Sequence, residues 1–147
     1  MMDQTLKREI IMDHYQTPRN KKTITDESYK SKHMAADSCI DDITVYVKGD
    51  GHKIVDVAFD GVGCTISTAS TSIMSELIKG KSYDEALAII QEYEDMLDEK
   101  EYDEDKLEEA NAFDTLSKQA NRINCGLIGV KGFKEVIEEL KRDEREQ

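Results

Sequence analysis

The sequence contains no tryptophan, a single proline and only three cysteines among 147 residues. The cysteines at positions 39, 64 and 125 cannot all pair with one another and lack the spacing of a small disulfide-bonded secreted domain, so we expect reduced thiols. No apolar run reaches the length of a membrane span, and residues 1–9 lack the hydrophobic core of a signal peptide. These absences predict a cytoplasmic protein that folds as a single domain over residues 1–147.

Basic side chains are also scarce, because 20 lysines and arginines stand against 32 aspartates and glutamates and give a net charge of −12. Proteins that bind nucleic acid neutralise phosphates with a basic surface, so we expect neither nucleic acid nor a membrane as a partner. Residues 92–109 hold eleven acids and two lysines and supply most of the net charge. Such a run is typical of a solvated surface, and the alternative is a docking surface for a basic partner.

Hydrophobic periodicity predicts a helix over residues 3–15, a polar loop over residues 21–36 and then a β-hairpin. The apolar side of the helix, expected to pack on the sheet, consists of Leu6, Ile10 and Ile11. The hairpin is indicated by apolar and polar residues that alternate over 43–48 and again over 55–59, on either side of an Asp50-Gly51 turn. It is the clearest structural signal in the chain.

Two further helices are predicted in the second half of the chain. One is opened by Ser82 and continues into the acidic residues 92–109, and the last one begins near Cys125 with Asn121 or Asn124 as its N-cap. Cys125 is therefore expected at a helix entrance.

Cys64 lies between a predicted strand and another predicted helix. Residues 54–59 are rich in β-branched and apolar side chains, Gly61 and Gly63 allow a tight turn, and Ser67 is the expected N-cap of the helix. A thiol at a helix entrance faces unpaired backbone N–H groups and the positive end of the helix dipole, which favour the thiolate that binds metals or attacks sulfur. The alternative is a small apolar residue that fills the turn.

The predicted topology brings a carboxylate to the thiols. If strand alternation extends backwards from Ile43, Cys39 and Asp41 lie on the same face, and the next strand leads directly to Cys64. With Cys125, three thiolates and one carboxylate match a tetrahedral zinc site, and three sulfur ligands match an iron–sulfur cluster. No CxxC pair is present, so spacing alone leaves this interpretation open against cysteines that only pack.

Several segments follow a known pattern. Residues 10–20 read IIMDHYQTPRN, residues 60–70 read DGVGCTISTAS, and residues 122–125 read RINC after a long stretch that starts at Gly80-Lys81. These segments resemble motifs of the IscU/NifU family of iron–sulfur assembly proteins. The first is similar to the DHYxxPRN ending of that family's first helix, and the second to its DGxGCxISxAS segment. The long stretch and its RINC end are similar to the extra segment and RxxC motif of the SufU branch. Asn124 stands where the IscU type carries a histidine. The chain therefore resembles the SufU branch over nearly its whole length.

This resemblance implies an α+β fold with helices on one face of a small three-stranded antiparallel sheet. It implies one zinc ion ligated by Cys39, Asp41, Cys64 and Cys125. In the SufU branch the protein accepts persulfide sulfur from a pyridoxal-phosphate cysteine desulfurase of the SufS type, which nominates Cys39 as the acceptor. Arg122 would be a cation near the site that favours a thiolate or persulfide. Other Suf assembly proteins and apo-proteins that receive iron–sulfur clusters would be further partners.

The chain departs from the family around the first cysteine, where the family reads NPTCGD and residues 36–41 read ADSCID. Ile40 removes the backbone freedom that a glycine provides between two ligands. Asp37 adds a negative charge beside Cys39 unless it caps a turn. Val130 replaces a common tryptophan, a change expected to affect packing more than chemistry.

Three functions fit these residues. The first is a zinc-dependent sulfurtransferase that works with a cysteine desulfurase, and the second is a scaffold on which a [2Fe–2S] or [4Fe–4S] cluster is assembled and passed to apo-proteins. In the third, zinc only fixes the fold and the acidic helix binds a partner. The first two describe a sulfur acceptor or scaffold and not a stand-alone enzyme. Of the histidines, His14 is expected to be packed, and His33 and His52 to lie in loops, with His33 the one that could reach the site.

Overall fold

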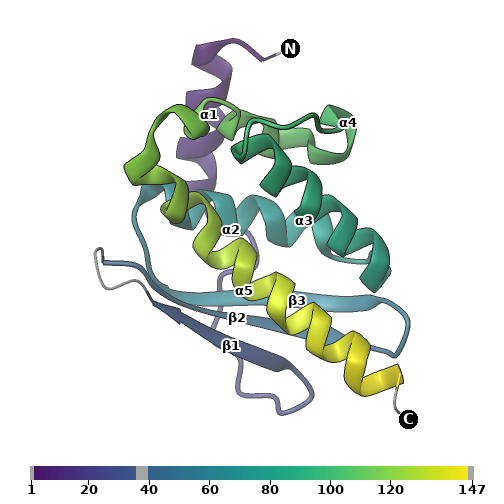
Figure 1. Cartoon of the computed structure of the whole chain (residues 1–147). Coiled ribbons are helices and arrows are strands. Elements are labelled where there is room, and N and C mark those ends of the chain that lie inside the picture. Colours follow the sequence, from purple (N-terminus) through teal and green to yellow (C-terminus); the bar gives the residue numbers. More distant parts are fainter. Residues whose placement is uncertain (1, 36–39, 146–147) are drawn as a thin grey trace.

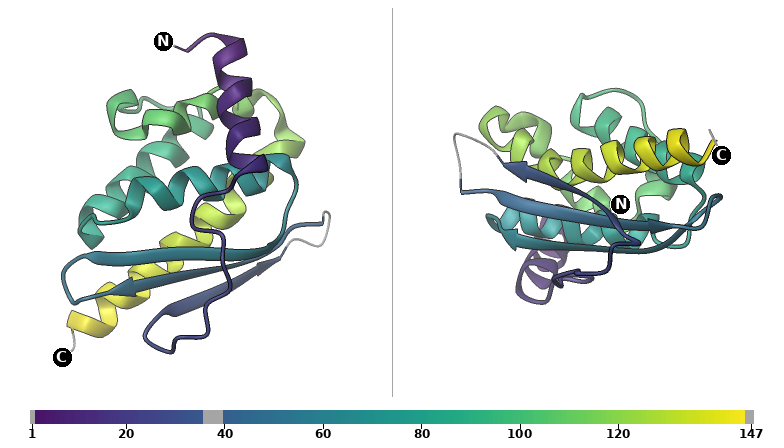
Figure 2. Two further views of the ribbon diagram at one scale, coloured as in Figure 1. Left: turned by 180° about the vertical axis from the view of Figure 1, so that it is seen from behind. Right: turned by 90° about the horizontal axis from the view of Figure 1, so that it is seen from below.

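The computed structural model describes residues 2–35 and 40–145, and these form a helical layer on a β-sheet (Figure 1). The sheet has three antiparallel strands in the order β1-β2-β3, namely β1 (Lys30–Ala35), β2 (Asp42–Gly49) and β3 (Ile54–Val62). The views of Figure 2 show the helices gathered on one face of this sheet. The predicted α+β fold is confirmed. In the described part of the chain, no helix combines the length and the apolar character needed to cross a membrane.

The helical layer is built around α5, which runs across the sheet (Figure 1). Helix α5 packs on β1 and β2, whereas α2 lies between α5, α1 and β3. The helices are α1 (Gln4–Gln16), α2 (Thr65–Ile78), α3 (Tyr83–Leu97), the short α4 (Glu104–Leu107) and α5 (Ala120–Arg145), with the 3-10 helices η1 (Glu108–Phe113) and η2 (Leu116–Lys118).

The predicted β2–β3 hairpin is confirmed. Val45 pairs with Phe59 and Val47 with Val57, and all four side chains are buried under the helices. Gly51 supplies the turn with a φ of 101°, which a side chain would disfavour. The alternation of apolar and polar residues therefore fixes which face of the sheet carries the core.

Strand β1 lies where the sequence predicted a loop, so that prediction was wrong for residues 30–35. The strand pairs with β2 from Lys30 opposite Val47 to Ala35 opposite Asp42. The positions of β1 opposite the buried valines of β2 are lysines. Their charges are paired with carboxylates of α5, as in the ion pair between Lys30 and Asp143 at 2.8 Å. A strand whose inward positions carry ion pairs shows no hydrophobic alternation, which explains the missed prediction.

Helix α1 begins after Asp3, whose carboxylate caps the backbone N–H of Leu6. The expectation that this helix packs on the sheet was wrong, because it packs mainly on α2 and η1. Its buried side chains are Lys7 and His14, whereas Leu6 is 43% exposed. Lys7 forms an ion pair with Asp114, with 2.7 Å between the charged atoms, and the partly buried Ile10 and Ile11 pack against the core, so both charge and apolar contacts fix this helix.

The acidic segment, residues 92–109, does not continue one long helix as predicted. Helix α3, opened by the predicted N-cap Ser82, ends at Leu97, and Glu99 then adopts the left-handed conformation with a φ of 60°. All acids between Asp98 and Glu109 are exposed. This exposure is what a solvated surface requires.

Candidate metal centre

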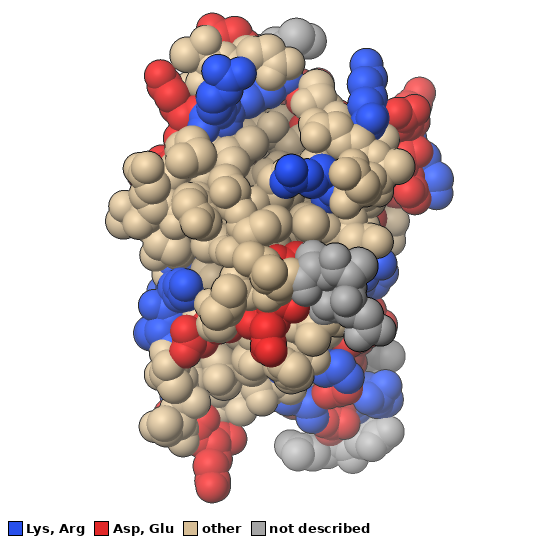
Figure 3. Space-filling view, turned by 90° about the vertical axis from the view of Figure 1, so that its left-hand side faces the viewer, with Lys and Arg blue, Asp and Glu red and all other residues tan. Residues whose placement is uncertain are grey.

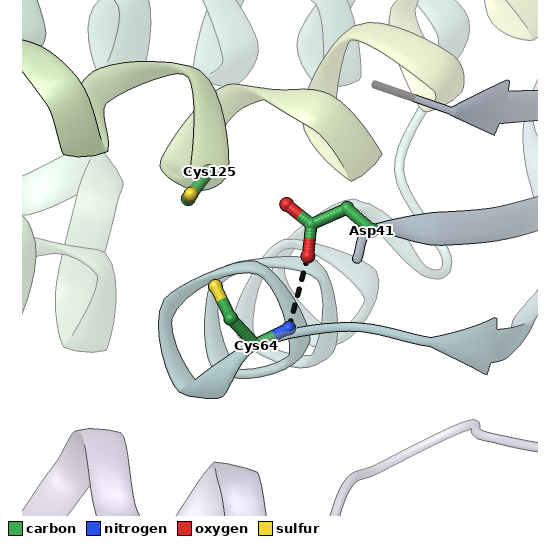
Figure 4. A group of neighbouring side chains, drawn as sticks. All are labelled: Asp41, Cys64 and Cys125. Atoms are coloured by element: carbon green, nitrogen blue, oxygen red, sulfur yellow. Dashed lines mark hydrogen bonds between the residues drawn. The ribbon is translucent and has the colours of Figure 1, made fainter. Parts of the chain in front are cut away.

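Three of the four predicted ligands meet at one end of the sheet. The ligand atoms of Asp41, Cys64 and Cys125 all lie within 4.8 Å of one another (Figure 4). Asp41 is 2% exposed and Cys125 is 8% exposed, whereas Cys64 is half-buried. The fourth predicted ligand, Cys39, lies outside the described residues. The three side chains come from the entry to β2, the start of α2 and α5, so distant parts of the chain converge here.

Cys64 is itself the N-cap of α2, so the expectation that Ser67 caps this helix was wrong. The Sγ atom of Cys64 accepts the backbone N–H of Ser67 at 3.4 Å, and the Cys64 carbonyl accepts the N–H of Thr68 at 3.0 Å. Before it, Gly61 has a φ of 118° and lies so close to β2 that a Cβ atom would be 2.1 Å from the Asp42 carbonyl oxygen. Gly61 therefore allows the chain to pass close to β2 just before Cys64 begins the helix.

Asp41 is held by the start of α2. Its Oδ1 atom accepts the backbone N–H of Cys64 at 2.9 Å and the hydroxyl of Ser67 at 2.7 Å. Figure 4 shows the second carboxylate oxygen on the side of Cys125. The contact between Ser67 and Asp41 was not predicted, and the only signal for it in the sequence was the position of Ser67 one helical turn after Cys64.

Cys125 lies inside α5 and not at a helix entrance, because the helix already begins at Ala120. Asn121 and Asn124 are therefore helical residues and not the N-cap that was expected. The hydroxyl of Tyr93, a fully buried residue of α3, donates a hydrogen bond to the carbonyl of Gly126 at 2.8 Å, next to Cys125. This bond ties the cysteine-bearing turn of α5 to α3.

Helix α5 approaches α2 closely at Gly129. A Cβ atom there would lie 1.9 Å from Oγ1 of Thr71, a buried residue of α2. The absence of a side chain at this position therefore permits the contact that places Cys125 opposite Cys64. The sequence alone did not predict this role of glycine in the middle of a helix, where it costs about 1 kcal/mol relative to alanine.

The three side chains fit a zinc ion. Zinc binds thiolate sulfur at about 2.3 Å and carboxylate oxygen at about 2.0–2.2 Å, so neighbouring ligand atoms in a tetrahedron are about 3.3–3.8 Å apart. Because 4.8 Å is the upper limit on these separations, binding zinc requires at most an inward adjustment of about one ångström. Two sulfurs and one oxygen leave one tetrahedral position for a fourth ligand, and Cys39 is two residues from Asp41 along the chain.

Arg122 lies in the first turn of α5 and is exposed. Within residues 2–35 and 40–145, its side chain forms no hydrogen bond or ion pair with the ligand group. Its role as a cation near the site stays a prediction. Ile40, which replaces the family's glycine, is 67% exposed, so its side chain is largely in solvent.

The histidines lie outside the ligand group. His33 is part of β1 and not of a loop, and its Nε2 atom lies 2.6 Å from Oδ1 of Asp42, which alternates with Asp41 and so faces away from it. His52 lies in the hairpin turn, as predicted. His14 is packed in α1, as predicted, with Nδ1 2.8 Å from the Ser72 hydroxyl. The described histidines therefore add no ligand to the candidate centre.

The surface around the candidate centre combines uncharged and apolar areas with an acidic patch. Figure 3 shows this face, whose upper middle is mainly uncharged and which carries an acidic patch just below its centre. Two apolar side chains are prominently exposed here, Ile40 at 67% and Val62 at 61%, and the pairing of Val62 with Asp42 places it beside the entry to β2. Ile40 and Val62 therefore add exposed apolar area beside the candidate centre.

Comparison with known proteins gives a consistent result. The chain is 39% identical over 134 residues to the zinc-dependent sulfurtransferase SufU of Bacillus subtilis, covering 90% of both chains. It is 34% identical over 105 residues to the iron–sulfur cluster assembly scaffold protein IscU of Thermotoga maritima, covering 71% of this chain and 74% of that one. A crystal structure from Fervidobacterium islandicum, named as an iron–sulfur cluster assembly scaffold for the SUF system, superimposes with a TM-score of 0.77 at 35% identity, covering 88% and 94% of the two chains.

The family assignment rests on most of the chain. Residues 6–126 match the family described as the NifU-like N terminal domain. This range includes most of the first helix, the sheet, and all three cysteines. The chain belongs to the NifU-like N-terminal domain family.

Proposed function

We propose that this protein takes part in iron–sulfur cluster assembly as a zinc-dependent sulfurtransferase, which accepts persulfide sulfur from a cytoplasmic pyridoxal-phosphate cysteine desulfurase. The observation that carries the proposal is the convergence of Asp41, Cys64 and Cys125 within 4.8 Å. The similarity to SufU of B. subtilis supports it, because that protein is named a zinc-dependent sulfurtransferase and is matched over 90% of its length.

The donor set assigns a role to each residue. Asp41, Cys64 and Cys125 would hold the zinc ion together with Cys39, and a bound zinc ion keeps coordinating thiols deprotonated. Cys39 would then be the acceptor, as the resemblance to the SufU branch implies. Arg122 would offset negative charge on a thiolate or persulfide.

The transfer step needs no external oxidant or reductant. The Cys39 thiolate attacks the terminal sulfur of the desulfurase persulfide, and a new S–S bond forms between Cys39 and that sulfur. The old S–S bond breaks, and the desulfurase cysteine leaves as a thiolate with the electron pair of that bond. The transferred sulfur keeps its proton, so atoms and charge balance.

The surface around the centre supports a protein as the sulfur donor. Exposed Ile40 and Val62 offer apolar area beside the site, and the upper middle of the face is mainly uncharged (Figure 3). These uncharged parts of the face can be desolvated at low cost, whereas charged groups lose hydration on docking.

The proposal is tested by the rate at which a SufS-type desulfurase releases alanine from cysteine in the presence of a reductant. The wild-type protein should stimulate the reaction, and Cys39→Ala should remove the stimulation and the added sulfur atom that mass spectrometry detects on the chain. Glu101→Gln, on the exposed acidic segment, serves as the control and should stimulate normally. Normal stimulation by Cys39→Ala would rule out the proposed acceptor.

The metal is tested by elemental analysis of protein purified without added metal. We expect about one zinc per chain, and much less in Asp41→Ala and Cys64→Ala. Protein without any metal would count against the whole assignment, because the ligand group would then serve no metal-dependent transfer.

The alternative function is a scaffold on which a [2Fe–2S] or [4Fe–4S] cluster is built and passed to apo-proteins. The similarity to IscU of T. maritima favours it, because the same three cysteines would supply sulfur ligands. Anaerobic incubation with iron and sulfide should then give a coloured protein with matching iron and sulfide contents, and a colourless, iron-free product would exclude it. If zinc were only structural, Cys39 substitutions would change sulfur transfer only in step with stability.

A further inference from the structure

Ser67 touches two members of the ligand group at once. Its backbone N–H donates to Sγ of Cys64 at 3.4 Å, and its hydroxyl donates to Oδ1 of Asp41 at 2.7 Å. The side chain is fully buried, so water cannot replace either contact. It is neither a predicted ligand nor the helix cap that the sequence indicated.

The hydroxyl of Ser67 has one proton and two nearby acceptors. The Cys64 carbonyl lies 3.2 Å away and already accepts the N–H of Thr68, whereas the Asp41 carboxylate lies 2.7 Å away and can carry a full charge. Bonds to an ionised acceptor are shorter and stronger than neutral ones, so the proton goes to Asp41. The Cys64 N–H points to the same oxygen at 2.9 Å, and the two donors together define the orientation of the carboxylate.

The surroundings of Ser67 are arranged for this contact. Gly63 leaves room for the hydroxyl, since a Cβ atom at position 63 would lie 2.5 Å from its Oγ atom. On the helix side, the Ser67 carbonyl accepts the hydroxyls of Thr71 at 2.7 Å and Ser70 at 3.2 Å. Hydrogen bonds within α2 therefore hold the backbone of Ser67. The absence of a side chain at Gly63 leaves room for the Ser67 hydroxyl to contact Asp41.

We propose that Ser67 is a positioning residue of the metal centre, which acts through Asp41 by holding its carboxylate against the start of α2. The inference rests on the proposed metal-dependent function. Without the Ser67 hydroxyl, Oδ1 of Asp41 loses one of the two hydrogen bonds that hold it against the start of α2, so the carboxylate is oriented less firmly toward the metal. Loss of such an outer hydrogen bond typically lowers metal affinity by about 10–100-fold.

The test measures zinc affinity by competition with a chromophoric chelator, for the full chain and four variants. Ser67→Ala should bind zinc about 10–100-fold more weakly than the wild type. Ser75→Ala, which removes another buried hydroxyl of α2 that donates to the backbone carbonyl of Ser72, away from the ligand group, is the matched control and should stay within about threefold. In the Asp41→Ala background, Ser67→Ala should cause no further loss, because its effect passes through Asp41.

If Ser67→Ala does not fold, a second variant, Gly63→Ala, disturbs the same contact between Ser67 and Asp41. Gly63→Ala keeps Ser67 but displaces its hydroxyl, so it should also weaken zinc binding in the wild type and not in Asp41→Ala. With Co²⁺ as the probe, the thiolate-to-metal absorption of Ser67→Ala should persist while the ligand-field bands change, since only the oxygen ligand is disturbed. A general loss of structure would abolish both sets of bands.

The outcomes separate this inference from the proposed function. Wild-type affinity in Ser67→Ala, or a further loss in the Asp41→Ala background, would overturn the role of Ser67 while the zinc site stands. Wild-type affinity in Asp41→Ala would instead refute the zinc site itself, and the inference with it.

Discussion

Two helix contacts, one between α2 and α5 and one between α1 and η1, are built on opposite principles. Beside the metal centre, α2 meets α5 through small residues, with Gly129 against Thr71 and no room for a Cβ atom. Between α1 and η1, the contact depends on the charged pair of Lys7 and Asp114 and on His14, whose Nε2 atom lies 3.5 Å from the Glu109 carboxylate. The first contact is limited by volume and the second by charge, so each should respond to a perturbation that the other tolerates.

The strongest way to break the volume-limited contact is Gly129→Ala. A Cβ atom 1.9 Å from Thr71 Oγ1 must push α5 away from α2, at a cost of about 2–3 kcal/mol even after the higher helix propensity of alanine is counted. Because Cys125 lies one turn away on α5, zinc content should fall as well. Urea denaturation and elemental analysis check the two effects.

Gly132→Ala is the graded control in the same helix. Its Cβ atom would lie 2.9 Å from Cγ of Met34 and from a methyl group of Val45, and the methionine can adapt. We therefore expect a smaller loss of stability and nearly normal zinc content. Equal effects at both glycines would show that α5 responds to side-chain volume in general and not to its contact with α2.

The charge-limited contact is broken by Asp114→Asn. Lys7 is 9% exposed and would keep its charge without a full partner, which should cost about 1–2 kcal/mol. Adding Lys7→Met should recover part of the loss, because an apolar side chain of similar length needs no partner. Urea denaturation of the single and double variants measures this recovery, and additive losses would contradict the ion-pair explanation.

The same contrast explains what the sequence could predict. The hairpin and the residues of the ligand group were predictable, because alternating apolar residues, glycine turns and family-like motifs are local signals. Strand β1 was missed because Lys30 and Lys32 face carboxylates of α5 instead of an apolar core. The packing of α1 was missed for the same reason, since the partner of Lys7 is 107 positions away at Asp114.

Within the ligand group, the sequence predicted which residues meet but not how they are held. Cys64 caps its helix with a sulfur atom, a role that propensities give to serine, threonine, aspartate and asparagine. Ser67 was assigned to that role because its type fits it. Its actual contact with Asp41 depends on the close approach of β2 and α2, which no local pattern encodes.

A pH change should separate the two contacts without any mutation. Burial and the nearby Arg19 guanidinium lower the pKa of His14 below its ordinary value of 6.5, and Glu109 opposes them in part. The unfolded chain therefore binds a proton more readily, so the stabilising contribution of neutral His14 is complete above pH 6.5 and is lost as the pH falls through the pKa of the folded state.

The geometry gives a reason for this preference. Ser72 accepts the backbone N–H of Arg19 at 2.8 Å, so its own proton is available for Nδ1 of His14, also at 2.8 Å. Protonation of the imidazole would turn that acceptor into a donor and break the arrangement. Urea denaturation from about pH 8 to about pH 5 should show a smaller pH-dependent loss in His14→Asn than in the wild type. Identical pH profiles would mean that other groups dominate.

The smallest expected effect concerns the acidic segment, residues 92–109. Glu99 follows the C-cap of α3 with a φ of 60°, a conformation that glycine adopts without cost and glutamate does not. Glu99→Gly should therefore stabilise the protein by about 0.5–1 kcal/mol and also remove one negative charge from a crowded surface. Glu101→Gln removes a charge without changing the backbone preference and should alter stability by less than about 0.5 kcal/mol. If both variants stabilise equally, charge repulsion and not the turn conformation limits the stability of this segment, and its acids are kept at a cost that only a binding partner would explain.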